Sequence, residues 1–142
     1  MQNYSRQYPL LSLSKMGYSI LVAGSRGWKN YSMIYRELAE FRVDHERLGG
    51  VTVIDGGAEG ADSLGNRAAL NLGFFTQRFL ITEEEWNRLG RKAGPVRNQR
   101  MLDEGKPSFA LIFWDGSSPG TKDMIQRLET VNIPKVVFEN SI

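Results

Sequence analysis

Residues 56–62, with the sequence Gly-Gly-Ala-Glu-Gly-Ala-Asp, are the part of this chain best suited to bind a negatively charged group. They follow a short apolar run at residues 51–54 and lead directly into a stretch with helical spacing that begins at Ala61. Glycines let a backbone approach a ligand closely, and the free N–H groups and the dipole at a helix start attract anions. A tight turn that binds nothing has the same pattern, so this turn alone leaves both interpretations open.

Two other glycine-bearing loops also stand between an apolar run and a helix-like stretch. One is Gly24-Ser25-Arg26, and the other spans residues 115–121 and contains Gly120 and Thr121. Loops at the carboxyl ends of parallel strands meet at one edge of a sheet, so we expect the three loops to converge. Backbone donors that converge at helix starts suit anions, and the three loops together predict a phosphate-bearing ligand.

The sequence lacks the residues of several other kinds of site. The loop at residues 24–28 has no third glycine at the spacing of the dinucleotide-binding fingerprint, and no Gly-Lys-Ser/Thr triplet of a P-loop occurs. There is no cysteine, and the single histidine, His45, falls in a polar helical stretch where we expect it to be solvated. These absences argue against a classical NAD enzyme, a P-loop NTPase, a Ser-His-Asp triad and a thiolate or histidine metal site.

Apolar runs and helical spacing alternate along the chain. The strand expected at residues 75–79 is more polar than the others, which is typical of the edge of a sheet. Strands that alternate with helices indicate a parallel sheet with right-handed crossovers. We therefore predict an α/β fold, a Rossmann-like three-layer αβα sandwich with a mostly parallel five-stranded sheet. The strands are expected at 18–23, 51–54, 75–79, 109–114 and 136–138, and the helices from about residues 32, 61, 83, 95 and 121.

Composition and charge limit the function more loosely. The chain has 142 residues and a formal net charge of +2, and no apolar run approaches the ~20 residues that a membrane-spanning helix needs. A weak net charge does not imply strong non-specific binding to nucleic acid or to a membrane. The first residues make a poor signal peptide. We expect a flexible leader at 1–16, a single domain at 17–142 and a cytoplasmic location without membrane contact.

The motifs taken together resemble the SLOG superfamily, which includes the DprA/Smf proteins and the LOG phosphoribohydrolases. Within it, the chain is most similar to the small, single-domain YspA-like, cpYpsA-related branch. The resemblance spans residues 18–138 and implies a Rossmann-like fold that binds a nucleotide or nucleotide-derived ligand at the carboxyl edge of its sheet. The matching blocks are residues 20–28, residues 56–62, Trp86 with residues 90–98, Met101, and Gly120 with Thr121.

The expected site residues lie in these matching blocks. Arg26 and Arg97 carry planar guanidinium groups that suit phosphate. Asn98 is expected either to bind a sugar hydroxyl or to brace a loop, and Thr121 either to cap the last helix or to donate to phosphate. Asp62 is expected to favour the helix dipole, to accept from a ribose or to orient Arg26. The full expected set is Gly24, Ser25, Arg26, Gly56, Gly57, Ala58, Gly60, Asp62, Arg97, Asn98, Gly120 and Thr121.

One departure from the LOG pattern limits the inference of catalysis. LOG enzymes carry Pro-Gly-Gly-x-Gly-Thr-x-x-Glu, and Met124 stands here at the position of the glutamate. A thioether cannot act as an acid or a base. The candidates for a replacement acid are Asp62, Glu59 and Asp123. We therefore predict a ligand-binding sensor or accessory domain, with a nucleotide N-glycosidic hydrolase and a DprA-like single-stranded DNA binder as alternatives.

Further expectations concern partners and aromatic residues. Asp115 and Asp123 are candidates to hold Mg²⁺ through ligand phosphates, and the LOG resemblance implies a homodimer as a candidate assembly. Nucleic acid is a less favoured partner than a small molecule.

Trp28 and Trp86 are expected to belong to the core, with stacking on a base as the alternative.

Overall fold

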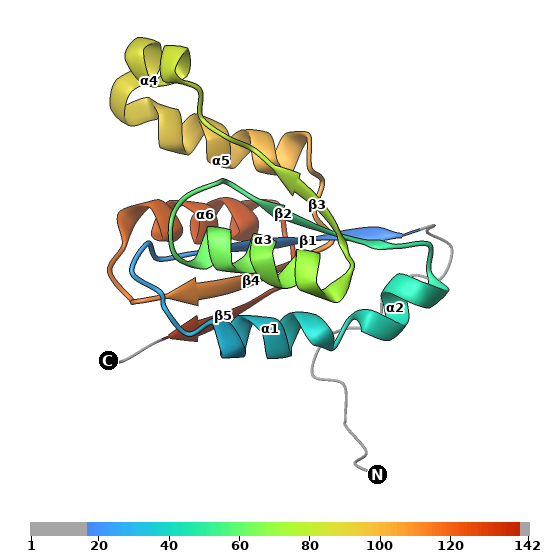
Figure 1. The fold of residues 1–142 in the computed structure, drawn as a ribbon. Coiled ribbons are helices and arrows are strands. Elements are labelled where there is room, and N and C mark those ends of the chain that lie inside the picture. The colour runs from blue at the N-terminus through green and yellow to red at the C-terminus, as the bar shows by residue number, and fades with distance from the viewer. Residues whose placement is uncertain (1–16, 140–142) are drawn as a thin grey trace.

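The computed structural model describes residues 17–139 of the chain. At its centre is a five-stranded sheet with the order β3-β2-β1-β4-β5, in which all neighbouring strands are parallel (Figure 1). The predicted Rossmann-like α/β fold is confirmed, with β3 at an edge. The leader expected at residues 1–16 lies outside the described residues. The strands are β1 (Tyr18–Gly24), β2 (Val51–Asp55), β3 (Phe75–Arg78), β4 (Phe109–Trp114) and β5 (Lys135–Glu139).

Helices cover both faces of this sheet and form the outer layers of the sandwich (Figure 1). Helices α1 and α3 pack on one face, and α5 and α6 pack on the other. Within residues 17–139, no helix combines the length and the apolar character that crossing a membrane would require. The helices are α1 (Tyr31–Ala39), α2 (Arg42–Arg47), α3 (Ala61–Leu72), α4 (Glu83–Leu89), the 3-10 helix η1 (Gly90–Lys92), α5 (Ala93–Asp103) and α6 (Pro119–Thr130).

Strands β1 and β4 are apolar at nearly every position because both of their faces are covered. Ile20 and Val22 of β1 lie in the core beneath α1 and α3, whereas Leu21 and Ala23 lie in the core beneath α5 and α6. Successive side chains of a strand point to opposite faces, so a strand buried on both sides has no polar positions to alternate with. This arrangement accounts for the continuous apolar runs in the sequence.

The connections from β1 and β4 leave the sheet on opposite faces. These two strands are neighbours, yet β1 leads to α1 on one face and β4 leads to α6 on the other. A reversal of this kind opens a crevice at the carboxyl ends of the strands. The three glycine-bearing loops follow β1, β2 and β4 and therefore lie at this edge of the sheet.

Several helix boundaries differ from the predicted ones by a few residues. The helix expected from residue 121 begins at Pro119, because proline fits the first position of a helix. The helix expected from residue 95 begins at Ala93, directly after η1. Helix α4 begins as predicted, with a capping box between Thr82 and Glu85. The helical stretch after residue 32 is divided near Phe41 into α1 and α2.

The prediction that His45 is solvated is wrong. Its imidazole is half-buried, and its Nδ1 atom accepts a hydrogen bond of 2.8 Å from the backbone N–H of Val51. The ring also contacts Phe74 and Phe75, with centroid separations of 5.0 and 5.4 Å. The helical periodicity around His45 could not reveal this role, because its partners come from the starts of other elements. His45 fastens α2 to the amino-terminal edge of the sheet.

Candidate functional site

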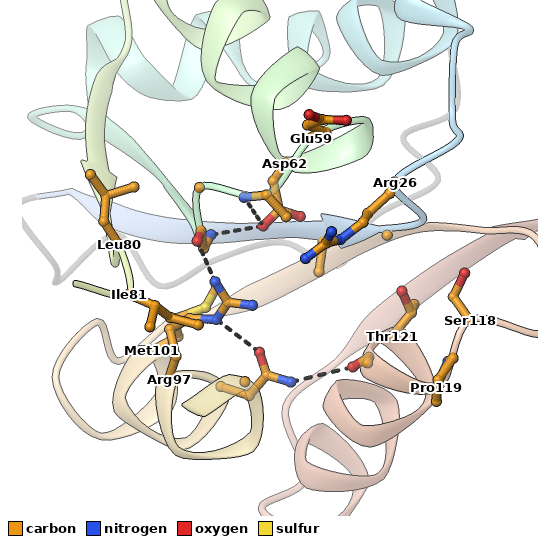
Figure 2. A pocket seen from close by; sticks show the side chains of 18 of the residues that line it. Arg26, Glu59, Asp62, Leu80, Ile81, Arg97, Met101, Ser118, Pro119 and Thr121 are labelled. Atoms are coloured by element: carbon orange, nitrogen blue, oxygen red, sulfur yellow. Dashed lines mark hydrogen bonds between the residues drawn. The ribbon is translucent and has the colours of Figure 1, made fainter. Parts of the chain in front are cut away.

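The three loops converge on a cavity of about 830 Å³ at the carboxyl edge of the sheet (Figure 2). Residues from the β3–α4 connection, α4 and α5 close its other side. Ten of the expected ligand-binding residues line this cavity, whereas Ser25 and Gly60 are not among its lining residues. The expected residues in the lining are Gly24, Arg26, Gly56, Gly57, Ala58, Asp62, Arg97, Asn98, Gly120 and Thr121.

Ser25 is buried and connects all three loops. Its hydroxyl oxygen accepts a hydrogen bond of 2.8 Å from the Asp115 backbone N–H, and the Ser118 hydroxyl lies 3.1 Å from the same oxygen. Its carbonyl oxygen accepts from the Ala61 N–H at 3.1 Å, at the start of α3. With every polar atom directed at the protein, Ser25 is placed to shape the cavity from behind its wall.

Gly60 allows the first two loops to approach each other. Its φ is +76°, and a Cβ atom there would lie 2.3 Å from the carbonyl oxygens of both Ser25 and Arg26. Backbone with this φ favours glycine, and such an overlap excludes any side chain without rearrangement. Gly60 is therefore required by the packing of the loops.

Asp62 organises the glycine-rich loop after β2. The side chain is only 5% exposed, and its Oδ2 atom accepts hydrogen bonds from the N–H groups of Gly56 at 3.0 Å and Ala58 at 3.3 Å. Burial raises the pKa of Asp62 to about 7, and the nearby charge of Asp55 adds to this increase. Arg97 and the two hydrogen bonds oppose the increase. Asp62 is therefore a carboxyl group that titrates near neutral pH in the wall of the cavity.

Asp55 is a structural residue of this site that the sequence analysis did not identify. It ends β2 with a fully buried side chain, which accepts from the Gly57 N–H at 2.7 Å and from Arg78 Nε at 3.0 Å. Burial raises the pKa of Asp55, while the hydrogen bond from Gly57 and the charge of Arg78 oppose that shift. The available signal was an acidic residue directly between a buried strand and a glycine pair.

Arg97 connects α5 to the glycine-rich loop that these carboxyl groups hold. Its Nη1 atom donates to the carbonyl oxygen of Gly56, and its Nε atom donates to Asn98 Oδ1 at 3.2 Å (Figure 2). Burial lowers the pKa of Arg97, and the charges of Asp62 and Asp55 oppose the decrease. The guanidinium therefore balances two buried acids and is only partly available to a ligand.

Asn98 braces the packing of α5 on α6. Its Nδ2 atom donates to Asp123 Oδ2 at 2.9 Å and to the Gly120 carbonyl oxygen at 3.3 Å. Asp123 also accepts from Arg127 Nε at 2.7 Å and does not line the cavity. Of the two roles expected for Asn98, the brace is present, and Asp123 is engaged in the same network.

Arg26 differs from Arg97 because its guanidinium is exposed and projects into the cavity (Figure 2). Within residues 17–139 it has no hydrogen-bond or ion-pair partner. Thr121 faces it from the third residue of α6, and Ser118 occupies the capping position that was predicted for Thr121. The first helical hydrogen bond of α6 comes from Lys122, which leaves the Gly120 and Thr121 N–H groups without a helical acceptor.

The opposite side of the cavity is apolar. Leu80 and Trp86 line it although they are 55% and 46% exposed, and the half-buried Ile81 lies beside Leu80. Leu80 also packs against the glycine-rich loop, since a Cβ atom on Gly57 would lie 2.1 Å from Leu80 Cδ2. Trp28, in contrast, is 4% exposed and packs against Phe113 within the core, with the two tilted rings 5.5 Å apart between centroids. The core prediction is therefore confirmed for Trp28 and wrong for Trp86.

The remaining acidic residues of the lining are Glu59, which is exposed, and Asp115. Asp115 Oδ1 accepts from the N–H groups of Ser117 and Ser118, both at 2.8 Å, and these hydrogen bonds lower the pKa of Asp115. Among residues 17–139, no group of three or more acidic, histidine or cysteine side chains could hold a metal ion. The expected magnesium candidates Asp115 and Asp123 therefore belong to two separate hydrogen-bond networks.

Comparisons with known proteins agree with this architecture. The family model described as "YspA, cpYpsA-related SLOG family" matches residues 18–81. The Gene 61 protein of Mycobacterium phage D29 is 33% identical over 123 residues, which cover 84% of this chain and 94% of that protein. The X-ray structure of DNA processing protein A (DprA) from Streptococcus pneumoniae matches with a TM-score of 0.64 and 18% identity. The match covers 92% of this chain but 52% of the DprA chain, so it shows a shared fold with about half of that protein.

Proposed function

The chain belongs to the YspA, cpYpsA-related SLOG family, and from this premise we propose that it binds a nucleotide or nucleotide-derived ligand in the cavity. The ligand carries a phosphate and a sugar, and the protein acts as a sensor or accessory domain. The observation that carries the proposal is Arg26, an unpartnered guanidinium in the described chain that faces the start of α6. A free cation next to free helical N–H groups is a combination that favours phosphate.

The size and lining of the cavity support a small ligand. Its volume of about 830 Å³ lies within the range of roughly 300–1,000 Å³ that is usual for small-molecule sites. One side offers apolar surface to a base, and the other offers charge and backbone N–H groups to a phosphate. The lining contains two arginines but also Glu59, Asp62 and Asp115. This mixed charge fits a compact anion with hydroxyl groups better than a long polyanion.

The test is a thermal-shift screen of the purified protein against nucleotides, cyclic nucleotides, NAD, ADP-ribose and sugar phosphates. A ligand at 100 times its dissociation constant stabilises the native state by about 2.7 kcal/mol. We expect a shift from phosphate-bearing compounds and not from the matching nucleosides. Arg26→Ala should reduce the affinity by tenfold or more, because a charge-assisted contact to phosphate is lost.

Arg47→Ala is the matched control, since Arg47 is exposed on α2 at the other edge of the sheet. It removes the same charge from the protein without touching the cavity. Equal weakening by Arg26→Ala and Arg47→Ala would mean that only net charge matters. The absence of any shift across the panel would contradict the proposed function.

A second candidate is hydrolysis of a nucleotide N-glycosidic bond, and the observation that favours it is Asp62. A carboxyl group with a pKa near 7 in a cavity has the protonation behaviour of a general acid or base. The LOG glutamate position offers no such group, because Met124 is 1% exposed and packs in the core beneath α6. Release of free base from a nucleoside monophosphate or an ADP-ribose-like compound, followed by chromatography, would support this candidate. No release from any compound that binds would exclude it.

A third candidate is single-stranded DNA binding, which the structural likeness to DNA processing protein A raises. Phosphate-driven binding is strongest at low salt, so labelled oligonucleotides should be tested there by fluorescence anisotropy. Binding that is weakened by Arg26→Ala and that falls steeply with salt would support this candidate. Unchanged anisotropy at low salt would remove it.

A further inference from the structure

Asp62 uses only one of its two carboxyl oxygens to hold the protein together. Both backbone N–H groups that it binds, those of Gly56 and Ala58, are directed at Oδ2. Within residues 17–139, Oδ1 has no hydrogen-bond partner, and it is not among the side-chain oxygens that are sealed from solvent without a partner. Because Asp62 lines the cavity, this second oxygen is the part of a 5%-exposed side chain that a ligand can reach.

The position of Asp62 along the cavity indicates which part of a ligand it would meet. In Figure 2, Arg26 and Thr121 lie to one side of Asp62, and the aliphatic side chains of Leu80 and Ile81 lie to the other. If the phosphate contacts the charged side and the base the apolar side, the sugar that connects them lies at Asp62. A carboxylate oxygen accepts hydrogen bonds, and a sugar presents hydroxyl donors.

We infer that Asp62 is the sugar-recognition residue of this site, and that its Oδ1 atom accepts a hydrogen bond from a ribose hydroxyl of the bound ligand. This inference rests on the proposed function and adds a stated preference for ribonucleotides over deoxyribonucleotides. It also accounts for a carboxylate at this position. Backbone N–H groups would be satisfied by the oxygen of an asparagine side chain, and that side chain would carry no buried charge.

Protonation of Asp62 allows the inference to be tested on the unaltered protein, through the pH dependence of its preference for ribose. The charge-assisted hydrogen bond exists only with the ionised carboxylate, and burial raises the pKa of this group to about 7. Preference for the ribo form is therefore greatest above pH 7 and declines as the pH falls below it. The charged groups around Asp62 are Asp55 from β2, Arg97 from α5, Arg26 from the loop after β1, and Glu59 from its own loop.

The experiment measures the dissociation constants of the four ribonucleoside 5′-monophosphates and of their 2′-deoxy and 3′-deoxy forms by calorimetry between pH 5.5 and 8.5. Each deoxy form carries the same phosphate as its parent, so protonation of the phosphate or of Asp55 affects both members of a pair alike. We expect one deoxy form to bind about tenfold more weakly at pH 8. The ratio of the dissociation constants of that deoxy form and its ribose parent should approach one at pH 5.5.

Asp62→Asn is the test variant, because its amide oxygen can still accept from Gly56 and Ala58 while the cavity receives an NH₂ group. The ratio between ribo and deoxy forms should fall to about one and lose its dependence on pH. Asp103→Asn is the control, since Asp103 is an exposed carboxylate of α5 outside the cavity. It should leave both the ratio and its pH profile unchanged.

The outcomes separate this inference from the proposed function. Equal binding of ribo and deoxy forms by the unaltered protein at pH 8 would overturn the role of Asp62 and leave nucleotide binding intact. A preference for ribose that survives in Asp62→Asn would overturn it equally. The absence of binding by any nucleotide would overturn both proposals.

Discussion

The two edges of the sheet differ in how far their polar side chains are hydrogen-bonded within the protein. At the amino-terminal edge, His45 Nδ1 accepts from Val51, and Tyr18 donates through its hydroxyl to Asp44 Oδ2 at 2.6 Å. At the carboxyl edge, Arg26 has no partner within the described chain, and Asp62 uses one oxygen only. Folded proteins satisfy nearly all buried polar groups. The carboxyl edge keeps an unpaired guanidinium inside a cavity and a buried carboxylate with one unused oxygen, so this is the edge where a ligand is expected. Five experiments test this contrast.

The largest effect on stability is expected from Gly60→Ala, which disrupts the packing of the loops at the carboxyl edge. The new Cβ atom would overlap two carbonyl oxygens at 2.3 Å on backbone with a φ of +76°. Strain and overlap together should lower the free energy of unfolding by about 4 kcal/mol, measured by urea denaturation. In Gly94→Ala the Cβ atom meets open space within α5, and stability should be unchanged or slightly higher. A loss below 1 kcal/mol for Gly60→Ala would contradict the described packing.

The next effect concerns the dependence of stability on pH. The pKa of Asp62 is about 7 in the native state against 3.8 without the protein environment, so the native state holds an extra proton between these values. The free energy of unfolding should therefore decrease as the pH rises from about 4 to 7, and should be constant above that. Asp62→Asn should remove the part of this decrease that Asp62 contributes and leave the smaller part from Asp55. At pH 8 it should be more stable than the unaltered protein by up to roughly 4 kcal/mol. Parallel profiles for the two proteins would show that Asp62 does not carry the raised pKa.

Arg97→Ala should have a smaller effect, about 2 kcal/mol at pH 8. The variant removes the charge that balances Asp62 and Asp55 and the donor to the Gly56 carbonyl. Asp62 can take up a proton in response, which limits the loss, and at pH 6 the loss should be smaller still. Arg91→Ala, an exposed position in η1, should change the free energy of unfolding by less than about 0.5 kcal/mol. An equal loss of stability at pH 6 and pH 8 would show that the role of Arg97 does not depend on the protonation of Asp62.

His45→Ala tests the amino-terminal edge, where we expect a purely structural effect. Loss of the acceptor for Val51 and of the contacts with Phe74 and Phe75 should cost about 1.5 kcal/mol in thermal or urea unfolding. Ligand affinity should not change, because the residue lies at the opposite edge from the cavity. Glu46→Ala, at an exposed neighbouring position of α2, is the control. A change in nucleotide affinity for His45→Ala would break the contrast between the two edges.

The smallest effect on stability is expected from Trp86→Ala. The side chain is 46% exposed at the apolar side of the cavity, so its removal should cost less than about 0.5 kcal/mol in unfolding. Nucleotide affinity should nevertheless fall, because the base would lose the aromatic surface that it contacts in the cavity. Calorimetry on Trp86→Ala and on Leu70→Ala, a 60% exposed apolar position of α3 outside the cavity, separates the two effects. Loss of affinity in both variants would show that the apolar side has no specific role.

The sequence identified the site through its loops but assigned several side chains imperfectly. Gly56, Gly57 and Arg26 were expected at the site and line the cavity. Ser25 belonged to the same local motif, yet its partners are Asp115 and Ser118, some ninety residues away. Asp55 had a local signal in its place between a buried strand and a glycine pair, but its role depends on burial and on Arg78 from β3. Motifs locate backbone loops, whereas the partner of a polar side chain depends on elements that are distant in sequence.

The amino-acid sequence alone predicts the succession of strands and helices along the chain, the parallel sheet and the edge where the loops meet. These features depend on local periodicity, on glycine and proline positions and on general rules of chain connection. The packing of the folded chain sets which polar groups bond within the protein and which remain for a ligand. It placed Trp28 in the core and Trp86 at the cavity, and it made Arg97 a brace and left Arg26 free. The physical reason is that desolvation and hydrogen-bond pairing are properties of the packed chain, which residue type and spacing do not contain.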